Sequence, residues 1–126
     1  MLSNRKEMYK QNDIKVVLAN ELPGITSEMM NTENVDSAYK CVHTLKGYTF
    51  AQVKRHNLKE AKSCFQVASK LHKSGDKTVK SAIENVFVYS FSHLPVANTA
   101  ELKTIKGLIP QTLYALYMNQ VMHQGV

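Results

Sequence analysis

The chain has few residues that break helices and few that could cross-link a fold. Its 126 residues include three prolines, five glycines, two cysteines and no tryptophan. So few breakers leave long uninterrupted stretches, which favours helices over a β fold with many turns. The two cysteines, Cys41 and Cys64, are too few for a disulfide framework. We expect both to be small apolar residues inside helices rather than redox or metal-binding groups.

Long apolar runs are also absent from the sequence. No stretch approaches the roughly 20 apolar residues that cross a bilayer as a helix. The first ten residues carry basic side chains but no apolar core follows them, so they do not read as a signal peptide. Hydrophobic residues still make up 44% of the chain, enough for a packed core. We therefore expect a cytoplasmic protein with a flexible segment over residues 1–12 and one domain over 13–126.

Helical periodicity runs through most of that domain. Apolar residues recur at steps of three or four, which places them on one face of a helix. We predict helices over residues 13–21, 35–55, 57–75, 76–94 and 98–107 and from 110 onward, with a short helical turn over 25–32. The predicted fold class is all-α, an antiparallel bundle of about five to six helices.

The helix predicted over residues 76–94 is unusually apolar, and it makes specific predictions. Gly75 is expected to end the preceding helix in the left-handed conformation, and Asp76 to cap the new one. Glu84 is expected to pair with Lys80, one turn earlier on the helix. Val88 would lie opposite the main apolar face. Either another element covers Val88, or Val88 belongs to a contact surface.

Positive charge is concentrated in the middle of the chain. The net charge is +6, and residues 40–80 contain ten Lys or Arg but only two Asp or Glu. In the helix of residues 57–75, four lysines fall opposite the apolar stripe. With their neighbours they form a candidate basic face, made of Lys54, Arg55, Lys59, Lys62, Lys70, Lys73, Lys77 and Lys80. Such a face suits an acidic protein or nucleic-acid phosphates, or it is a solvated surface that keeps the bundle soluble.

Two features weigh against sequence-specific recognition of nucleic acid by this face. Arg55 is its one arginine, and arginine is the residue suited to bidentate recognition of bases. No aromatic side chain lies between the lysines of the helical strip to stack on bases. Non-specific contact with phosphates is the alternative that stays open.

No group of residues in the sequence indicates an active site. No serine or cysteine lies in the context of an activated nucleophile, and no glycine-rich phosphate loop occurs. The histidines are scattered, with no pair four residues apart: His43, His56, His72, His93 and His123. We expect no catalytic activity, no cofactor and no metal site.

The last helix carries aromatic and methionine side chains whose role the sequence leaves open. Tyr114, Tyr117, Met118 and Met122 are of the types enriched at protein interfaces. The same residue types are also ordinary filling for a helical core. Both readings are compatible with their spacing.

Two stretches of the chain resemble a known family. They are GDKTVKSAIENVFVYSFSHL, residues 75–94, and PQTLYALYMNQVMHQG, residues 110–125. They are similar to a family of small helical proteins found mainly in Bacteroidetes and classed as a domain of unknown function. The resemblance covers residues 13–125 and implies a bacterial, cytoplasmic, all-α domain. It implies no activity, ligand or catalytic residue.

The leading functional hypothesis is a non-catalytic protein–protein interaction module. Its partner would be an acidic protein, steered by the basic face, or a second copy of the chain. An immunity or antitoxin role is one specific version of this hypothesis. The alternative is a non-specific nucleic-acid-associated protein that uses the basic face of residues 54–80. We expect no membrane partner.

Overall fold

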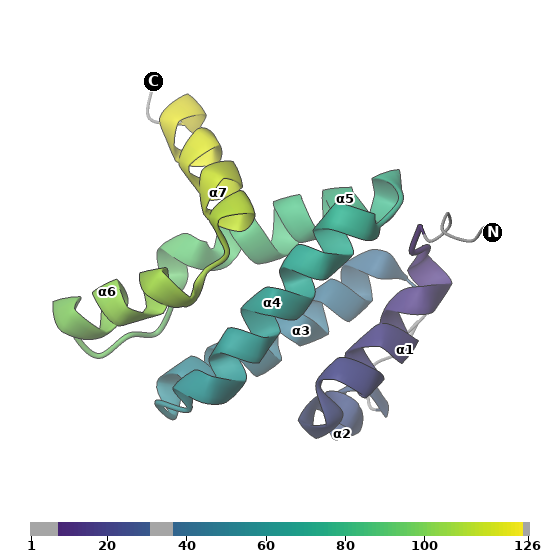
Figure 1. Ribbon diagram of the computed structural model, residues 1–126, viewed down its shortest axis with the longest axis horizontal. Coiled ribbons are helices and arrows are strands. Elements are labelled where there is room, and N and C mark those ends of the chain that lie inside the picture. Colours follow the sequence, from purple (N-terminus) through teal and green to yellow (C-terminus); the bar gives the residue numbers. More distant parts are fainter. Residues whose placement is uncertain (1–7, 31–36, 125–126) are drawn as a thin grey trace.

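The computed structural model describes residues 8–30 and 37–124, and within these ranges the protein is built from helices (Figure 1). The elements in chain order are α1 (Gln11–Glu21), the 3-10 turn η1 (Pro23–Ile25), α2 (Thr26–Met30), α3 (Ala38–Lys54), α4 (Leu58–Ser74), α5 (Lys77–Ala82), the π-helical segment η2 (Ile83–Phe87), the 3-10 segment η3 (Val88–His93), α6 (Thr99–Leu108) and α7 (Gln111–Gln124). No strand occurs among these elements. The prediction of an all-α fold is confirmed, and the number of helices is close to that predicted.

The long helices α3 and α4 form the central hairpin of the molecule (Figure 1). Helices α1 and α2 pack on one side of this hairpin, and the segment from α5 through η3 packs on the other. Helix α6 contacts α4, and α7 contacts η3. The predicted start of the second helix at residue 35 lies outside the described residues. In the described part, Ser37 caps α3.

Helix α4 has the two faces that its sequence predicts. Ala61, Phe65, Ala68 and Leu71 have no exposed surface. The side chain of Asn57 caps the helix by accepting a hydrogen bond from the Glu60 N–H at 3.4 Å. Local signals were sufficient here, because an amphipathic pattern and its cap are both encoded within one stretch of chain.

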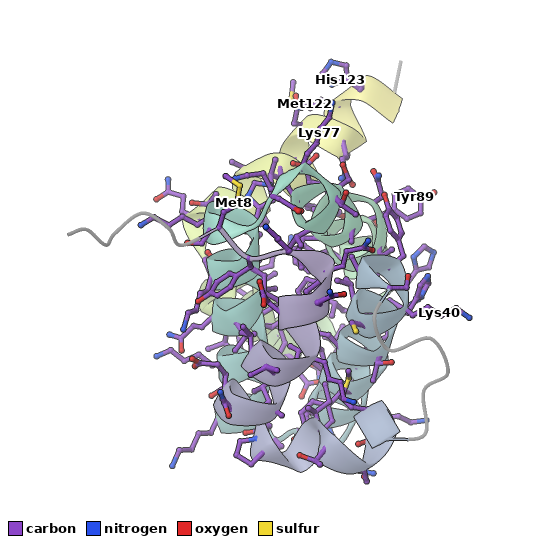
Figure 2. All side chains as sticks on the ribbon, turned by 90° about the vertical axis from the view of Figure 1, so that its right-hand side faces the viewer. Met8, Lys40, Lys77, Tyr89, Met122 and His123 are labelled. Atoms are coloured by element: carbon purple, nitrogen blue, oxygen red, sulfur yellow. The ribbon has the colours of Figure 1, made fainter. Side chains whose placement is uncertain are left out.

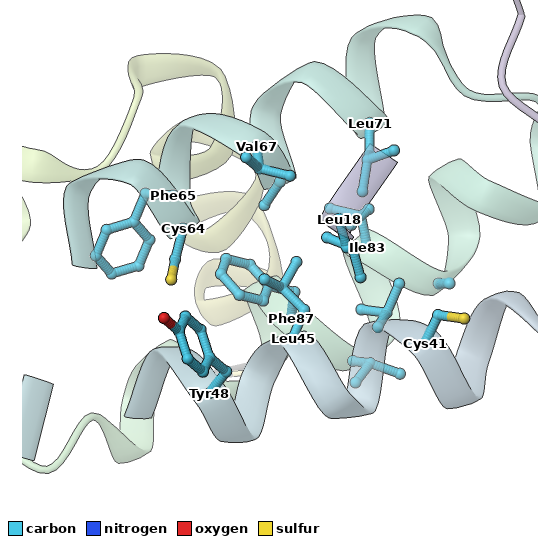
Figure 3. Packing of buried hydrophobic residues seen from close by; sticks show 14 of the residues in the cluster. Leu18, Cys41, Leu45, Tyr48, Cys64, Phe65, Val67, Leu71, Ile83 and Phe87 are labelled. Atoms are coloured by element: carbon cyan, nitrogen blue, oxygen red, sulfur yellow. The ribbon is translucent and has the colours of Figure 1, made fainter. Parts of the chain in front are cut away.

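An aromatic cluster joins α4 to the segment that follows α5. Phe65, Phe87 and Phe91 contact one another edge to face, with ring centroids 5.6 to 6.0 Å apart. Figure 3 shows Phe65 and Phe87 within the buried cluster, close to Tyr48 and Cys64. Edge-to-face pairs contribute about 0.5–1.5 kcal/mol beyond the burial of their area. This cluster fixes α4 against η2 and η3.

Gly75 follows the end of α4 as predicted, but the left-handed conformation predicted for it was wrong. Gly75 has φ −82° and ψ 158°, which is extended backbone and not the left-handed conformation. A Cβ atom at Gly75 would come within 2.4 Å of the Leu71 carbonyl oxygen and of Val79 Cγ1. Glycine is therefore required by close packing at the α4–α5 corner.

The N-terminal part of the described chain is bonded to this same corner. The Tyr9 N–H donates to the Ser74 carbonyl, and the Asp76 N–H donates to the Tyr9 carbonyl, both at 2.7 Å. Helix α1 starts at Gln11, two residues before its predicted start. Residues 11 and 12 therefore belong to α1. Residues 1–7 of the predicted flexible segment lie outside the described residues.

The helix predicted over residues 76–94 changes its hydrogen-bond pattern twice. Helix α5 ends at Ala82, a π-helical turn covers Ile83–Phe87, and a 3-10 segment covers Val88–His93. A π-helical turn adds a residue to the turn, so it rotates the following side chains about the axis. Val88 is fully buried, while Tyr89 is 54% exposed. Val88 is therefore enclosed within the protein and does not belong to an exposed contact surface, which excludes the second of the two alternatives.

Candidate functional site

The four lysines of α4 lie in a row on the solvent side of the helix. Lys59, Lys62, Lys70 and Lys73 are all exposed. At 1.5 Å per residue, the row from Lys59 to Lys73 is about 21 Å long. We call this row, with its neighbours at both ends of α4, the α4 basic face.

The neighbours extend the α4 basic face at both ends of the helix. Lys54 and Arg55 end α3 just before α4 begins, and both are exposed. Lys77 begins α5 just after α4 ends and is also exposed (Figure 2). Lys80, one turn further on, is half-buried. The chain connections therefore bring the predicted residues to the same helix and its two ends.

Two members of the face are engaged within the molecule. Lys70 Nζ lies 2.7 Å from Glu21 Oε2, and this hydrogen bond raises the pKa of Lys70. Both side chains of the pair are more than 40% exposed, so the pair adds little stability. Lys80 Nζ donates to the main-chain oxygen of His72 at 2.7 Å. Lys80 thus caps the carboxyl end of α4, where the helix dipole favours a cation.

The prediction that Lys80 pairs with Glu84 was wrong. Glu84 Oε2 instead lies 2.7 Å from His72 Nε2. The ammonium of Lys80 is occupied by the α4 carbonyls, so Glu84 joins the histidine across the α4–η2 contact. His72 is half-buried at this contact.

Two acidic side chains near the start of α4, Glu60 and Glu101, hold helices together instead of pairing with the lysines. Glu60 accepts a hydrogen bond from the Tyr48 hydroxyl, and burial together with this bond raises the pKa of Tyr48. Glu101 accepts from the Ala97 N–H at 2.8 Å and pairs with His56, and both contacts lower the pKa of Glu101. The Glu60 carboxylate is thus bonded to α3, and the Glu101 carboxylate to the α3–α4 turn and to the loop before α6.

Six cations of the α4 basic face therefore keep no acidic partner among the residues that the structure describes. They are Lys54, Arg55, Lys59, Lys62, Lys73 and Lys77. Their charge is directed to solvent and is available to a binding partner.

The structure also forms a groove that sequence reasoning missed. It lies between α3 and the η2–η3 segment and has a volume of about 380 Å³. Its lining includes His43, Lys46 and Phe50 from α3, and Asn85, Tyr89 and His93 from the other side. Their spacings, H-x2-K-x3-F and N-x3-Y-x3-H, place each set on one side of its helix, which was the available signal.

The electrostatics of this groove are basic. Burial, Lys46 and Lys40 lower the pKa of His43. Figure 2 shows Lys40 and Tyr89 projecting from the same side of the molecule. None of the described residues that line the groove is acidic. In the described part of the chain, no three His, Cys, Asp or Glu side chains come together in a way that could hold a metal ion.

Both cysteines are buried inside helices, as predicted. Burial raises the pKa of Cys64 to about 11, so its thiol stays protonated at neutral pH. Since the thiolate is the reactive form, we expect neither Cys41 nor Cys64 to react with a disulfide reagent in the native protein. Absorbance at neutral pH should show two thiols reacting only after denaturant is added. A fast-reacting thiol without denaturant would contradict this assignment.

No helix in the described ranges is long and apolar enough to cross a membrane.

A comparison with models of protein families shows to which family the chain belongs. The model of a family described as Domain of unknown function (DUF7674) matches residues 16–123, most of the chain. The chain belongs to this family. The resemblance found in residues 75–94 and 110–125, to a family of unknown function, is thereby confirmed. The DUF7674 chain matches no curated protein and no solved structure.

Proposed function

We propose that the protein is a non-catalytic interaction module that binds an acidic partner protein through the α4 basic face. The observation that supports the proposal is the set of exposed cations without acidic partners along α4 and at its two ends. If the lysines only kept the protein soluble, their charges could equally well be spread over the whole surface. Here ten of the sixteen Lys and Arg of the chain fall in residues 40–80.

The chemistry of the face fits steering better than a tight, dry contact. Lysine is a flexible and strongly hydrated cation, so rows of lysine attract an opposite charge at long range. Such attraction raises the association rate, and it weakens as salt shortens the Debye length from about 30 Å at 0.01 M to about 8 Å at 0.15 M. We therefore expect a complex whose formation depends on ionic strength.

The test is affinity capture from lysate of the native host at low salt, with and without nuclease. We expect a stoichiometric acidic protein that stays bound after nuclease and elutes as salt is raised. Captured proteins that disappear on nuclease treatment would contradict the proposal.

The second candidate is non-specific binding of nucleic acid, which the unpaired lysines of the α4 row also favour. The probe is a labelled DNA duplex, titrated at several salt concentrations. Neutralising Lys59, Lys62, Lys73 and Lys77 with glutamine should then reduce the slope of log affinity against log salt by up to about 0.9 per lost phosphate contact. An unchanged slope would exclude the α4 basic face as the site. The cytoplasmic location and the immunity or antitoxin role stay predictions.

A further inference from the structure

The last helix differs in charge from the rest of the protein. Charged residues make up 21% of the chain, yet no Asp, Glu, Lys or Arg occurs after Lys106. Helix α7, Gln111–Gln124, lies wholly within this uncharged stretch. A surface helix normally carries charged side chains on its solvent side. Uncharged side chains therefore make up both the packed side of α7 and its free side.

Helix α7 is attached to the body along one side and stands away from it on the other (Figure 1). On the attached side Leu113 is fully buried, and the ring of Tyr117 lies 5.7 Å from that of Phe91. The Gln120 side chain donates to the Glu84 carbonyl oxygen at 2.9 Å. These contacts fix the rotation of α7 and decide which side chains face away.

The outward side of α7 is mixed, with apolar side chains along its middle and the polar Thr112, Asn119 and His123 exposed beside them. Met118 is 38% exposed, Val121 39% and Met122 68%, and Ala115 and Gln111 are exposed as well. Met122 and His123 project beyond the body in Figure 2. The aromatic and methionine residues of α7 therefore fall into two groups, one in the core and one at the surface. Tyr117 packs against the core, while Met118 and Met122 do not.

Four of these outward residues are spaced by four, three and four positions. They are Gln111, Ala115, Met118 and Met122, which we call the α7 seam. Alternating steps of three and four give the 3.5-residue repeat by which two helices pair side by side. The seam is about 17 Å long at 1.5 Å per residue.

We propose that the α7 seam pairs with the α7 seam of a second copy of this chain, antiparallel about a two-fold axis. In an antiparallel two-fold pair, the numbers of two residues that face each other always add up to the same value. Ala115 then faces Met118 of the other copy, and Gln111 faces Met122. Small or polar side chains thus meet long flexible ones, and methionine adapts to the space that alanine leaves.

The absence of charge on α7 favours a second copy over other occupants. An interface with two-fold symmetry places the same surface on both partners, so any charge on its axis meets its own copy. The protein carries +6 overall, and the α4 basic face would repel itself. The α7 seam adds no such repulsion. An acidic partner would find no cation on it.

The length of the α7 seam limits the affinity that we expect for the dimer. Stable interfaces typically bury about 800 Å² on each partner, and one short helix provides less than that. We therefore expect a weak dimer, with a dissociation constant on the order of micromolar. This dimer does not depend on the function proposed for the α4 basic face.

The test is sedimentation velocity of the full chain from about 1 μM to a few hundred μM, a range that spans weak association. The wild-type protein should shift from monomer to dimer. Met118→Lys should weaken dimerisation at least about tenfold, because each dimer then carries two ammonium groups in an apolar contact. Thr104→Lys, at an exposed position on α6, adds the same charge and should leave the dimer unchanged.

A rescue experiment tests the antiparallel register. In the double variant Ala115→Glu, Met118→Lys, each glutamate faces a lysine of the other copy, so dimerisation should recover relative to Met118→Lys. A parallel pair would oppose like charges and weaken further. A wild-type monomer at the highest concentration, or an unaffected Met118→Lys dimer, overturns the proposal. Circular dichroism and thermal melting confirm that each variant stays folded.

Discussion

Replacing Phe65 with alanine is expected to lower the free energy of unfolding by about 3–5 kcal/mol, which is the usual cost of deleting a buried aromatic ring. Phe65 has no exposed surface, and its ring contacts Phe87 and Phe91 edge to face. The variant loses both aromatic contacts and leaves a cavity between α4 and the η2–η3 segment. Urea denaturation followed by circular dichroism gives the value.

The matched control for this variant is Lys70→Ala on the opposite face of the same helix. Lys70 is exposed, and its pair with Glu21 is open to solvent, so the change should stay within roughly 0.5 kcal/mol. Equal effects of the two substitutions would show that the faces of α4 are assigned wrongly. This comparison tests the packing that presents the basic face to solvent.

Substitution of Gly75 by alanine is expected to destabilise the protein by about 1–3 kcal/mol, the typical cost of forcing extra volume into a packed site. The backbone of Gly75 is extended and tolerates a side chain, so the penalty is steric. The new methyl group would overlap the Leu71 carbonyl and Val79. It would also disturb the hydrogen bonds that Tyr9 makes at this corner. Denaturant midpoints measure the effect.

Gly47→Ala is the control for Gly75→Ala. Gly47 is exposed within α3, and a Cβ atom there would meet no atom within 4 Å. Alanine should therefore stabilise the helix by about 0.5–1 kcal/mol, because glycine is the poorer helix former. If both substitutions stabilise the protein, the close packing described for Gly75 is absent in solution.

The parts of the fold that were predicted correctly depend on signals close together in the sequence. The apolar stripe of α4, which is as predicted, lies within one segment together with the Asn57 cap. The role of Gly75 depends instead on the way α5 turns from α4, which brings Val79 and the Leu71 carbonyl oxygen against Gly75. The π-helical turn was foreshadowed by Val86, Phe87 and Val88. Three consecutive apolar residues cannot share one face of a regular α-helix.

The candidate site shows the same division between local and tertiary information. Helical spacing alone places Lys59, Lys62 and Lys73 on the solvent side of α4. Which lysines are engaged internally depends on tertiary contacts, as with the carbonyls that Lys80 caps. The groove beside Tyr89 needs the packing of α3 against the η2–η3 segment. No spacing within one helix brings His43 and His93 to the same surface.

The central claim is that the α4 basic face binds an acidic protein, and one comparison tests it most directly. The face variant changes Lys59, Lys62, Lys73 and Lys77 to glutamine, and the control variant changes Lys15, Lys40, Lys103 and Lys106, which are exposed elsewhere. Both lose four positive charges, so net charge cannot separate them. We predict that the face variant loses the captured partner in a binding titration while the control keeps most of its affinity. Equal binding by the two variants would contradict the account.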